Sequence, residues 1–174
     1  MNLFISGSTS DIVADRYFGS VHPVVEKLVK YKDIGLVAGD YPRGIMAILY
    51  DEALSQHKEV IAISQDEFTH GEDIITGDWL KQLYEQSDVF LFFPGGIETY
   101  ELLFYFIQEN KRRNLHKKII IYNIDYFFTP IVKELYHLYE EKFIERVPSE
   151  YIIIESNQNE LIEIIEKERK LWKN

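Results

Sequence analysis

Short apolar runs recur along the chain, and stretches in which apolar residues have helical spacing separate them. Six runs have the length of strands: Asn2–Ser6, Ile34–Ala38, Glu59–Ile63, Val89–Phe93, Lys118–Tyr122 and Tyr151–Glu155. Their centres are continuously apolar, which is typical of parallel strands covered by helices on both faces. The pattern therefore predicts an α/β protein with a mainly parallel sheet.

Helices are expected in the intervals between these runs. Their ranges are Tyr17–Tyr31, Gly44–His57, Thr76–Gln86, Glu98–Asn110, Thr129–Lys142 and Asn159–Trp172. Glycine and proline stand in the gaps and mark turns. Because no repeat, low-complexity tract or linker interrupts the alternation, we predict one doubly wound domain over residues 1–174.

Composition narrows the possible functions. The 174 residues carry 19 Lys and Arg against 29 Asp and Glu, a net charge of −10 that argues against binding extended nucleic acid. The absence of cysteine excludes disulfides, thiolate metal sites and a thiol nucleophile. The chain starts without signal-peptide features and has no apolar run near the roughly twenty residues of a membrane span, so we expect a soluble cytoplasmic protein that does not bind membranes.

In sheets of this kind, ligands bind beyond the carboxyl ends of the strands. The loop after the first predicted strand contains Ser8, which can hydrogen-bond a ligand or cap the next helix. The loop after the second contains Gly39 and Gly44, suited to a turn close to phosphate, and Arg43, which can clamp an anion.

The loop after the fourth predicted strand carries the strongest signal. Gly95 and Gly96 follow a buried strand, and a helix with Thr99 in its first turn begins almost at once. Free backbone N–H groups and the positive end of a helix dipole are therefore expected at this edge of the sheet. This combination indicates a site for an anionic ligand.

The segment Pro94-Gly95-Gly96-Ile97-Glu98-Thr99 resembles the PGGxGTxxE motif of the Lonely Guy family, nucleotide phosphoribohydrolases also labelled lysine decarboxylase-like. Further segments resemble the family in the same order over essentially the whole chain: Leu36 to Ala47, Ser87-Asp88, Leu115 to Lys118, and Asn123 to Pro130. The resemblance implies a modified Rossmann sheet, a homodimer, and a nucleoside monophosphate bound across the PGG turn. It also implies cleavage between base and ribose 5′-phosphate by a glutamate late in the motif and an arginine on the preceding helix.

Both catalytic positions of the family differ in this chain. The glutamate position falls on Leu102, and Glu101 precedes it by one residue, a turn of about 100° around a helix. The arginine position falls on Trp79, and the helix expected there contains no arginine. Trp79 is interpreted either as a stacking platform for a base or as a core or interface aromatic residue.

The phosphate-binding turns differ as well. Glu98 replaces a glycine of the PGG motif, and Asp40 and Tyr41 replace two glycines of the second turn. One hypothesis is that the Glu98 carboxylate substitutes for phosphate on the helix N-terminus. The alternative is that it is a solvent-facing charge in a first helical turn.

Three functions remain open from the sequence. The first is a nucleotide- or nucleoside-binding protein with weakened or lost hydrolase activity. The second is an active phosphoribohydrolase with Glu101 as a displaced catalytic carboxylate and Arg43 supplying the lost positive charge, and the third cleaves unphosphorylated nucleosides. Lysine decarboxylation is not expected, because it normally needs pyridoxal phosphate on a lysine and these loops contain none.

No cofactor or metal is expected either. His70, Glu72 and Asp78 lack the spacing of a ligand set. The basic residues Lys111 to Arg113 and Lys117-Lys118 are interpreted as charges at a helix C-terminus rather than as a binding patch. The helix expected over Glu98–Asn110 is apolar almost all round, which favours a second subunit on one of its faces.

Overall fold

A computed structural model of the chain describes residues 1–64 and 78–172. Within these residues, one parallel sheet has the strand order β3-β2-β1-β4-β5-β6. The strands are β1 (Asn2–Ser6), β2 (Gly35–Gly39), β3 (Val60–Ile63), β4 (Val89–Phe92), β5 (Lys118–Tyr122) and β6 (Ile153–Glu155). The predicted parallel α/β fold is confirmed.

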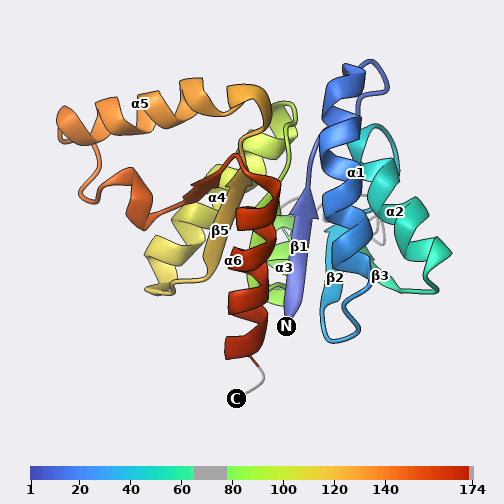
Figure 1. Cartoon of the computed structure of the whole chain (residues 1–174). Helices are drawn as coiled ribbons and strands as arrows, with labels where there is room; N and C mark the ends of the chain where they lie inside the picture. Colours follow the sequence, from blue (N-terminus) through green and yellow to red (C-terminus); the bar gives the residue numbers. More distant parts are fainter. Residues whose placement is uncertain (65–77, 173–174) are drawn as a thin grey trace, which may run out of the picture.

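Helices cover both faces of the sheet (Figure 1). The helices α1 (Asp15–Val29), α2 (Ile45–Ser55) and α6 (Gln158–Leu171) pack on one face. The helices α3 (Asp78–Gln86), α4 (Ile97–Arg113) and α5 (Thr129–Glu140) pack on the other. The expected start of α3 at Thr76 lies outside the described residues.

Two short 3-10 turns were not expected from the sequence. They are η1 (Ile124–Tyr126) and η2 (Pro148–Glu150). The backbone N–H groups of Tyr151 and Ile152 both bond to the carbonyl of Pro148, so η2 delays the start of β6 relative to the predicted strand. The proline starts this turn because its fixed φ suits a first helical position.

The core is divided by the sheet into two clusters. Leu3 and Ile5 point into the aliphatic cluster beneath α1, α2 and α6, whereas Phe4 between them points into an aromatic cluster on the other face. There the ring centroids of Phe90 and Phe106 lie 4.3 Å apart, and those of Phe4 and Phe106 lie 5.1 Å apart. Much of the aromatic content of the chain therefore packs between the sheet and α4.

The strand order creates a switch point at the centre of the sheet. The chain runs from β1 outward to β2 and β3, and then from β4 outward to β5 and β6. β1 and β4 are hydrogen-bonded neighbours, but α1 and α4, which follow them, pack on opposite faces. Loops that diverge in this way leave a crevice at the carboxyl edge, where ligands bind in doubly wound sheets.

Candidate functional site

The structure brings the three loops singled out from the sequence into direct contact. The backbone N–H of Ser8 donates to the carbonyl of Pro94 at 2.9 Å, which joins the loops after β1 and β4. The N–H of Met46 donates to the carbonyl of Ser8 at 3.3 Å, which joins the start of α2 to the same loop. The site is therefore one backbone-bonded assembly at the switch point.

Two glycines allow this close approach. Gly44 has φ +55°, and a Cβ atom there would lie 2.5 Å from the carbonyl oxygen of Ser10 and 2.8 Å from that of Ser8. At Gly95, a Cβ atom would lie 2.0 Å from Thr99 Oγ1. A side chain at either position would separate the loops, so these two predicted site residues are structural parts of the crevice.

The N-terminus of α2 is occupied by the chain itself. The backbone N–H of Gly44 donates to Asp11 Oδ1 at 3.3 Å, and the guanidinium of Arg43 binds Asp11 Oδ2. This bond from Arg43 is the main reason that the pKa of Asp11 lies below its usual value. Arg43 was expected to clamp an anionic ligand, but its partner in the structure is Asp11.

The N-terminus of α4 is open by comparison. Its N-cap, Gly96, offers no side-chain cap, and the N–H groups of Gly96, Ile97 and Glu98 make no hydrogen bond within residues 1–64 and 78–172. The Glu98 side chain is exposed and makes no hydrogen bond or ion pair in that part of the chain. The carboxylate therefore does not occupy these donors as the phosphate-substitute hypothesis requires.

Two cavities flank the loops after β1 and β4. The larger, about 270 Å³, is lined by Ser8, Val13, Ala14, Tyr17, Pro94, Gly95, Gly96 and Phe127. The smaller, about 40 Å³, includes Gly39, Tyr41, Trp79, Glu98, Thr99 and Leu102 in its wall. The predicted binding residues are thus divided between two adjacent spaces, and Arg43 and Gly44 line neither.

Tyr17 and Phe127 were not identified from the sequence as site residues. Their ring centroids lie 5.8 Å apart in an edge-to-face arrangement, and both line the larger cavity. The guanidinium of Arg16 lies over the Tyr17 ring and pairs with Asp125, which links α1 to η1. Phe127 lies in the Asn123 to Pro130 segment that resembles the family, which could have marked it as a site residue. Its contact with Tyr17 follows only from the fold.

The resemblance placed the family's catalytic glutamate and arginine at Leu102 and Trp79. Leu102 is 7% exposed and forms part of the smaller cavity's wall, together with the half-buried Trp79. Glu101, the displaced carboxylate, is exposed, lines neither cavity and has no partner among the described residues. Glu98 is the acidic residue that does reach a cavity wall.

The sequence analysis considered three residues for a metal site, and the structure does not describe their side chains. His70 and Glu72 lie outside the described residues, as does the side chain of Asp78. Within the described ranges, no group of three or more His, Cys, Asp or Glu residues is arranged to hold a metal ion. No helix in those ranges is long and apolar enough to cross a membrane.

A protein-family model described as "possible lysine decarboxylase" matches residues 46–165. None of the curated proteins matches the chain. The match includes the Pro94 to Thr99 and Asn123 to Pro130 segments, both of which carried the resemblance in the sequence.

Solved structures share the fold over nearly the whole chain. The molybdenum cofactor carrier protein from Chlamydomonas reinhardtii has a TM-score of 0.70 at 10% identity, covering 95% of this chain and 96% of that one. The protein TM1055 has a TM-score of 0.69 at 16% identity, covering 95% and 98%. The molybdenum cofactor binding protein from Rippkaea orientalis has a TM-score of 0.63 at 14% identity, covering 95% and 94%. At these identities the likeness establishes the fold alone.

Proposed function

The chain belongs to the possible lysine decarboxylase family, and from this premise we propose that it is a binding protein for a nucleotide-class ligand that it does not hydrolyse. The observation that carries the proposal is the pair Leu102 and Glu101. An apolar side chain stands in the cavity wall where the family pattern has a carboxylate, and the neighbouring carboxylate lines neither cavity. Glycosidic cleavage passes through an oxocarbenium-like state that needs a carboxylate beside the sugar.

The ligand's phosphate is assigned to the start of α4. The unbonded N–H groups of Gly96, Ile97 and Glu98 and the helix dipole there favour an anion. A Cβ atom at Gly96 would meet no other atom within 4 Å, so a ligand can approach this backbone closely. The α2 N-terminus is less suited, because Asp11 already holds its first donor.

The ligand's planar ring is assigned to the larger cavity. Its volume of about 270 Å³ is close to the lower end of small-molecule sites, whereas the smaller cavity of about 40 Å³ holds little more than one water molecule. Tyr17 and Phe127 supply aromatic surface on which a heterocycle packs. A ligand with both phosphate and ring therefore suits the site better than a free base.

A second ligand class is a phosphorylated pterin. Two of the similar structures are described as a molybdenum cofactor carrier protein and a molybdenum cofactor binding protein. Such a ligand also combines a planar heterocycle with a phosphate, so the same donors and aromatic surface serve it. We keep it as the second candidate because the likeness to those proteins is one of fold.

The test combines binding with a search for turnover. Calorimetry with AMP and adenosine is expected to show binding of AMP that weakens at least about tenfold when the phosphate is absent. Chromatography of the same mixtures is expected to show no released adenine. Adenine released from AMP by the unaltered chain but not by Glu101→Ala would contradict the proposal and favour the phosphoribohydrolase. Adenine released from adenosine but not from AMP would favour the nucleoside-cleaving enzyme.

Matched variants locate the ligand. Gly96→Val has open space around its Cβ position and a φ of −85° that any residue adopts, so it should fold while obstructing the phosphate donors. We expect it to weaken AMP binding at least about tenfold. Glu101→Ala, five residues further along the chain and outside both cavities, should leave binding unchanged. Equal affinity of Gly96→Val and the unaltered protein would refute this location, and a molybdopterin that binds where AMP does not would select the second ligand class.

A further inference from the structure

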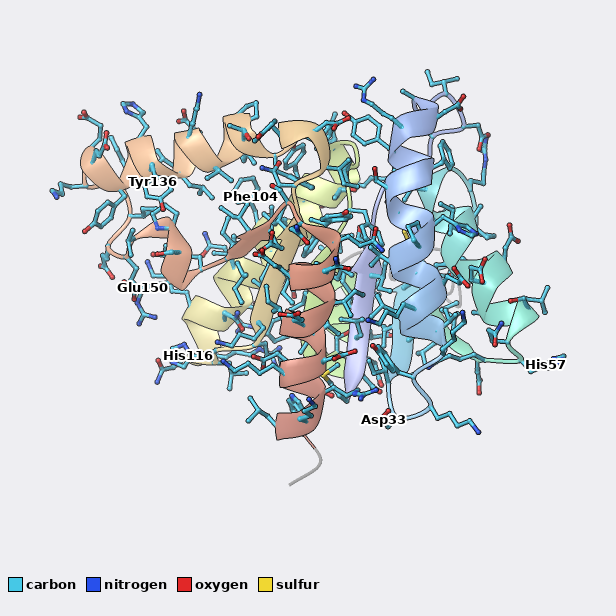
Figure 2. All side chains as sticks on the ribbon, in the orientation of Figure 1. Asp33, His57, Phe104, His116, Tyr136 and Glu150 are labelled. Carbon is cyan, nitrogen blue, oxygen red and sulfur yellow. The ribbon has the colours of Figure 1, made fainter. Side chains whose placement is uncertain are left out.

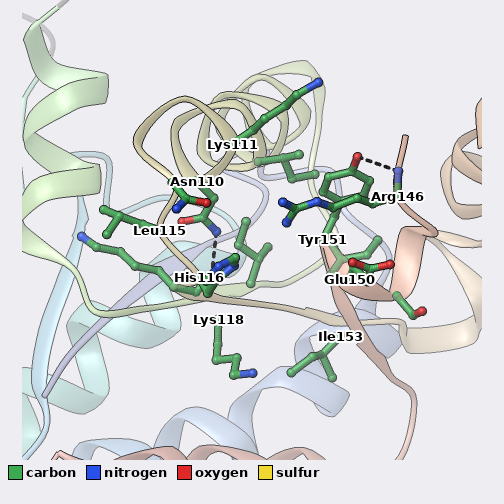
Figure 3. Close-up of a pocket in the computed structure, with 15 residues that line it drawn as sticks. Asn110, Lys111, Leu115, His116, Lys118, Arg146, Glu150, Tyr151 and Ile153 are labelled. Atoms are coloured by element: carbon green, nitrogen blue, oxygen red, sulfur yellow. Dashed lines mark hydrogen bonds between the residues drawn. The ribbon is translucent and has the colours of Figure 1, made fainter. Parts of the chain in front are cut away.

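A cavity of about 340 Å³, drawn in Figure 3, shares no lining residue with the two cavities of the proposed ligand site. It is bounded by the last turn of α4, the loop leading into β5, and the segment from Arg146 to the start of β6. Lys118, the first residue of β5, is in its wall, so the cavity opens at the amino ends of the strands. The nucleotide-class site is at their carboxyl ends.

Basic side chains gather around this cavity from two separate parts of the chain. Lys111 is near the end of α4, His116 is in the following loop and Lys118 begins β5, whereas Arg146 comes from the segment after α5. In Figure 3, Lys111 lies above the opening and Lys118 below it, and Arg146 and Tyr151 come from the opposite wall. Figure 2 shows His116 and Glu150 on the same side of the whole molecule.

The basic residues divide into those with internal partners and those without. Arg112 and Arg113 both bind the buried carboxylate of Glu109, at 2.6 and 2.7 Å. Lys117 Nζ donates to the carbonyl oxygens of Tyr84 and Ser87 at 2.8 and 2.7 Å. These three therefore have structural partners, whereas Lys111 and Lys118, which the sequence analysis interpreted in the same way, do not.

Four basic residues in the lining of the cavity have no such partner. Within residues 1–64 and 78–172, the side chains of Lys111, His116, Lys118 and Arg146 make no hydrogen bond or ion pair. Glu150 is the acidic residue in the wall, and its carboxylate has no partner in that part of the chain either. Lys111, Lys118 and Arg146 thus line the cavity as unpaired positive charges beside the single carboxylate of Glu150.

The cavity also has an apolar wall. Ile107, Ile153 and the 40% exposed Leu115 contribute aliphatic surface to it. The hydroxyl of Tyr151 accepts a hydrogen bond from the backbone N–H of Arg146 at 3.3 Å. This bond holds Arg146 close to Tyr151 in the cavity wall. Positive charge beside apolar surface suits an organic anion better than an inorganic one.

We propose that this cavity binds a small organic phosphate whose non-phosphate part is apolar or aromatic. Its volume falls in the range of small-molecule sites. A dianionic phosphate in the cavity complements the positive charges of Lys111, Lys118 and Arg146, and Arg146 provides a planar donor pair that matches phosphate oxygens. The site is separate from the nucleotide-class site and does not depend on it.

Calorimetry with phenyl phosphate, and with inorganic phosphate for comparison, tests the proposal. To silence the carboxyl-edge site, both are titrated into the Gly96→Val protein as well as the unaltered chain. We expect phenyl phosphate to bind the Gly96→Val protein, more tightly than inorganic phosphate does, and more weakly as salt is raised. The double variant Lys111→Gln/Arg146→Gln is expected to lower the affinity at least about tenfold.

The charge-matched control is Lys133→Gln/Lys167→Gln, which removes two exposed lysines from α5 and α6. It should retain the affinity of the unaltered chain. Loss of binding in Gly96→Val, an equal loss in the control, or no saturation by about 10 mM phenyl phosphate would each overturn the proposal. Amide NMR shifts on titration should concentrate in residues 111–118 and 146–153, and shifts confined to the loops after β1 and β4 would contradict it.

Discussion

Asp11 Oδ1 accepts a hydrogen bond of 3.3 Å from the backbone N–H of Gly44, at the start of α2. A carboxylate of the chain thus occupies the kind of donor that phosphates bind in related folds, and it also holds Arg43. At the start of α4 the corresponding donors have no partner among the described residues, although Glu98 is next to them. The N-termini of α2 and α4 both follow glycine-containing loops. They therefore differ in the backbone donors that are left for a ligand.

Asp11→Asn should destabilise the protein at neutral pH. The hydrogen bond from Arg43 lowers the pKa of Asp11, so the ionised carboxylate contributes stability above its unfolded pKa of about 3.8 and loses it as the pH falls through the folded pKa. We expect a lower urea midpoint for the variant at pH 7 and a smaller difference at about pH 3. An equal difference at both pH values would contradict this origin.

Gly44→Ala should be one of the most damaging single changes in the loops. Its positive φ and the backbone atoms 2.5 to 2.8 Å from a Cβ position oppose any side chain, so we expect a loss of at least about 2 kcal/mol in the free energy of unfolding. Gly96→Ala is the control, because open space surrounds that Cβ, and it should stay within about 0.5 kcal/mol. Chemical denaturation of both variants provides the comparison, and similar losses would show that the loop contacts are not the cause.

Glu109→Gln should weaken the end of α4. Glu109 is 5% exposed, and the hydrogen bonds from Arg112 and then Arg113 lower its pKa despite burial. The ionised carboxylate therefore stabilises the fold above its unfolded pKa of about 4.5, and this contribution is lost on acidification. Urea unfolding at pH 7 should show a loss of about 1–3 kcal/mol. A variant as stable as the unaltered chain at pH 7 would exclude the network as a stabilising element.

Alkaline pH should destabilise the protein through buried tyrosines. Burial raises the pKa of Tyr50 and of Tyr84 to about 12, so the neutral phenols contribute stability below pH 10 that is lost as the pH rises toward 12. Tyr50→Phe removes one such group together with the 2.6 Å hydrogen bond to the carbonyl of Gly39. It should cost about 1 kcal/mol at pH 7 and show a shallower alkaline loss. A curve parallel to that of the unaltered chain would argue against a role for Tyr50.

A homodimer remains a prediction, and the structure indicates which face to test. Phe104 on α4 and Tyr136 on α5 are 37% and 39% exposed, and Phe143 beyond α5 is 78% exposed. Phe104 and Tyr136 lie toward the same side of the molecule in Figure 2. Light scattering should give about twice the 20.6 kDa of one chain, and Phe104→Arg should shift the mass toward the monomer.

The control for this interface is Leu54→Arg, which places the same charge at a 75% exposed leucine on α2, on the other face of the sheet. It should not change the mass. A monomeric unaltered chain, or a dimer that both substitutions dissociate equally, would exclude the proposed face.

The strands could be predicted because each depends on a local pattern. Continuous apolar runs identified β1 and β5 with the bounds that the structure has. Glycine and proline marked the loop after β4, which is part of the candidate site. The start of β6 was less predictable, because a single turn at Pro148 displaced it while the apolar run continued through Tyr151 and Ile152.

The sequence by itself determined the parallel α/β class, the family and the loops that form the crevice, because periodicity and short motifs are properties of neighbouring residues. Only the tertiary structure decided that Asp11 holds Arg43, that Tyr17 meets Phe127, and that Lys111 and Arg146 share a cavity. These residues lie tens of positions apart, and their pairing follows from which faces α1 and α4 cover and how β5 and β6 align. Charge and ring contacts over such separations are set by packing, and no local pattern in the chain records them.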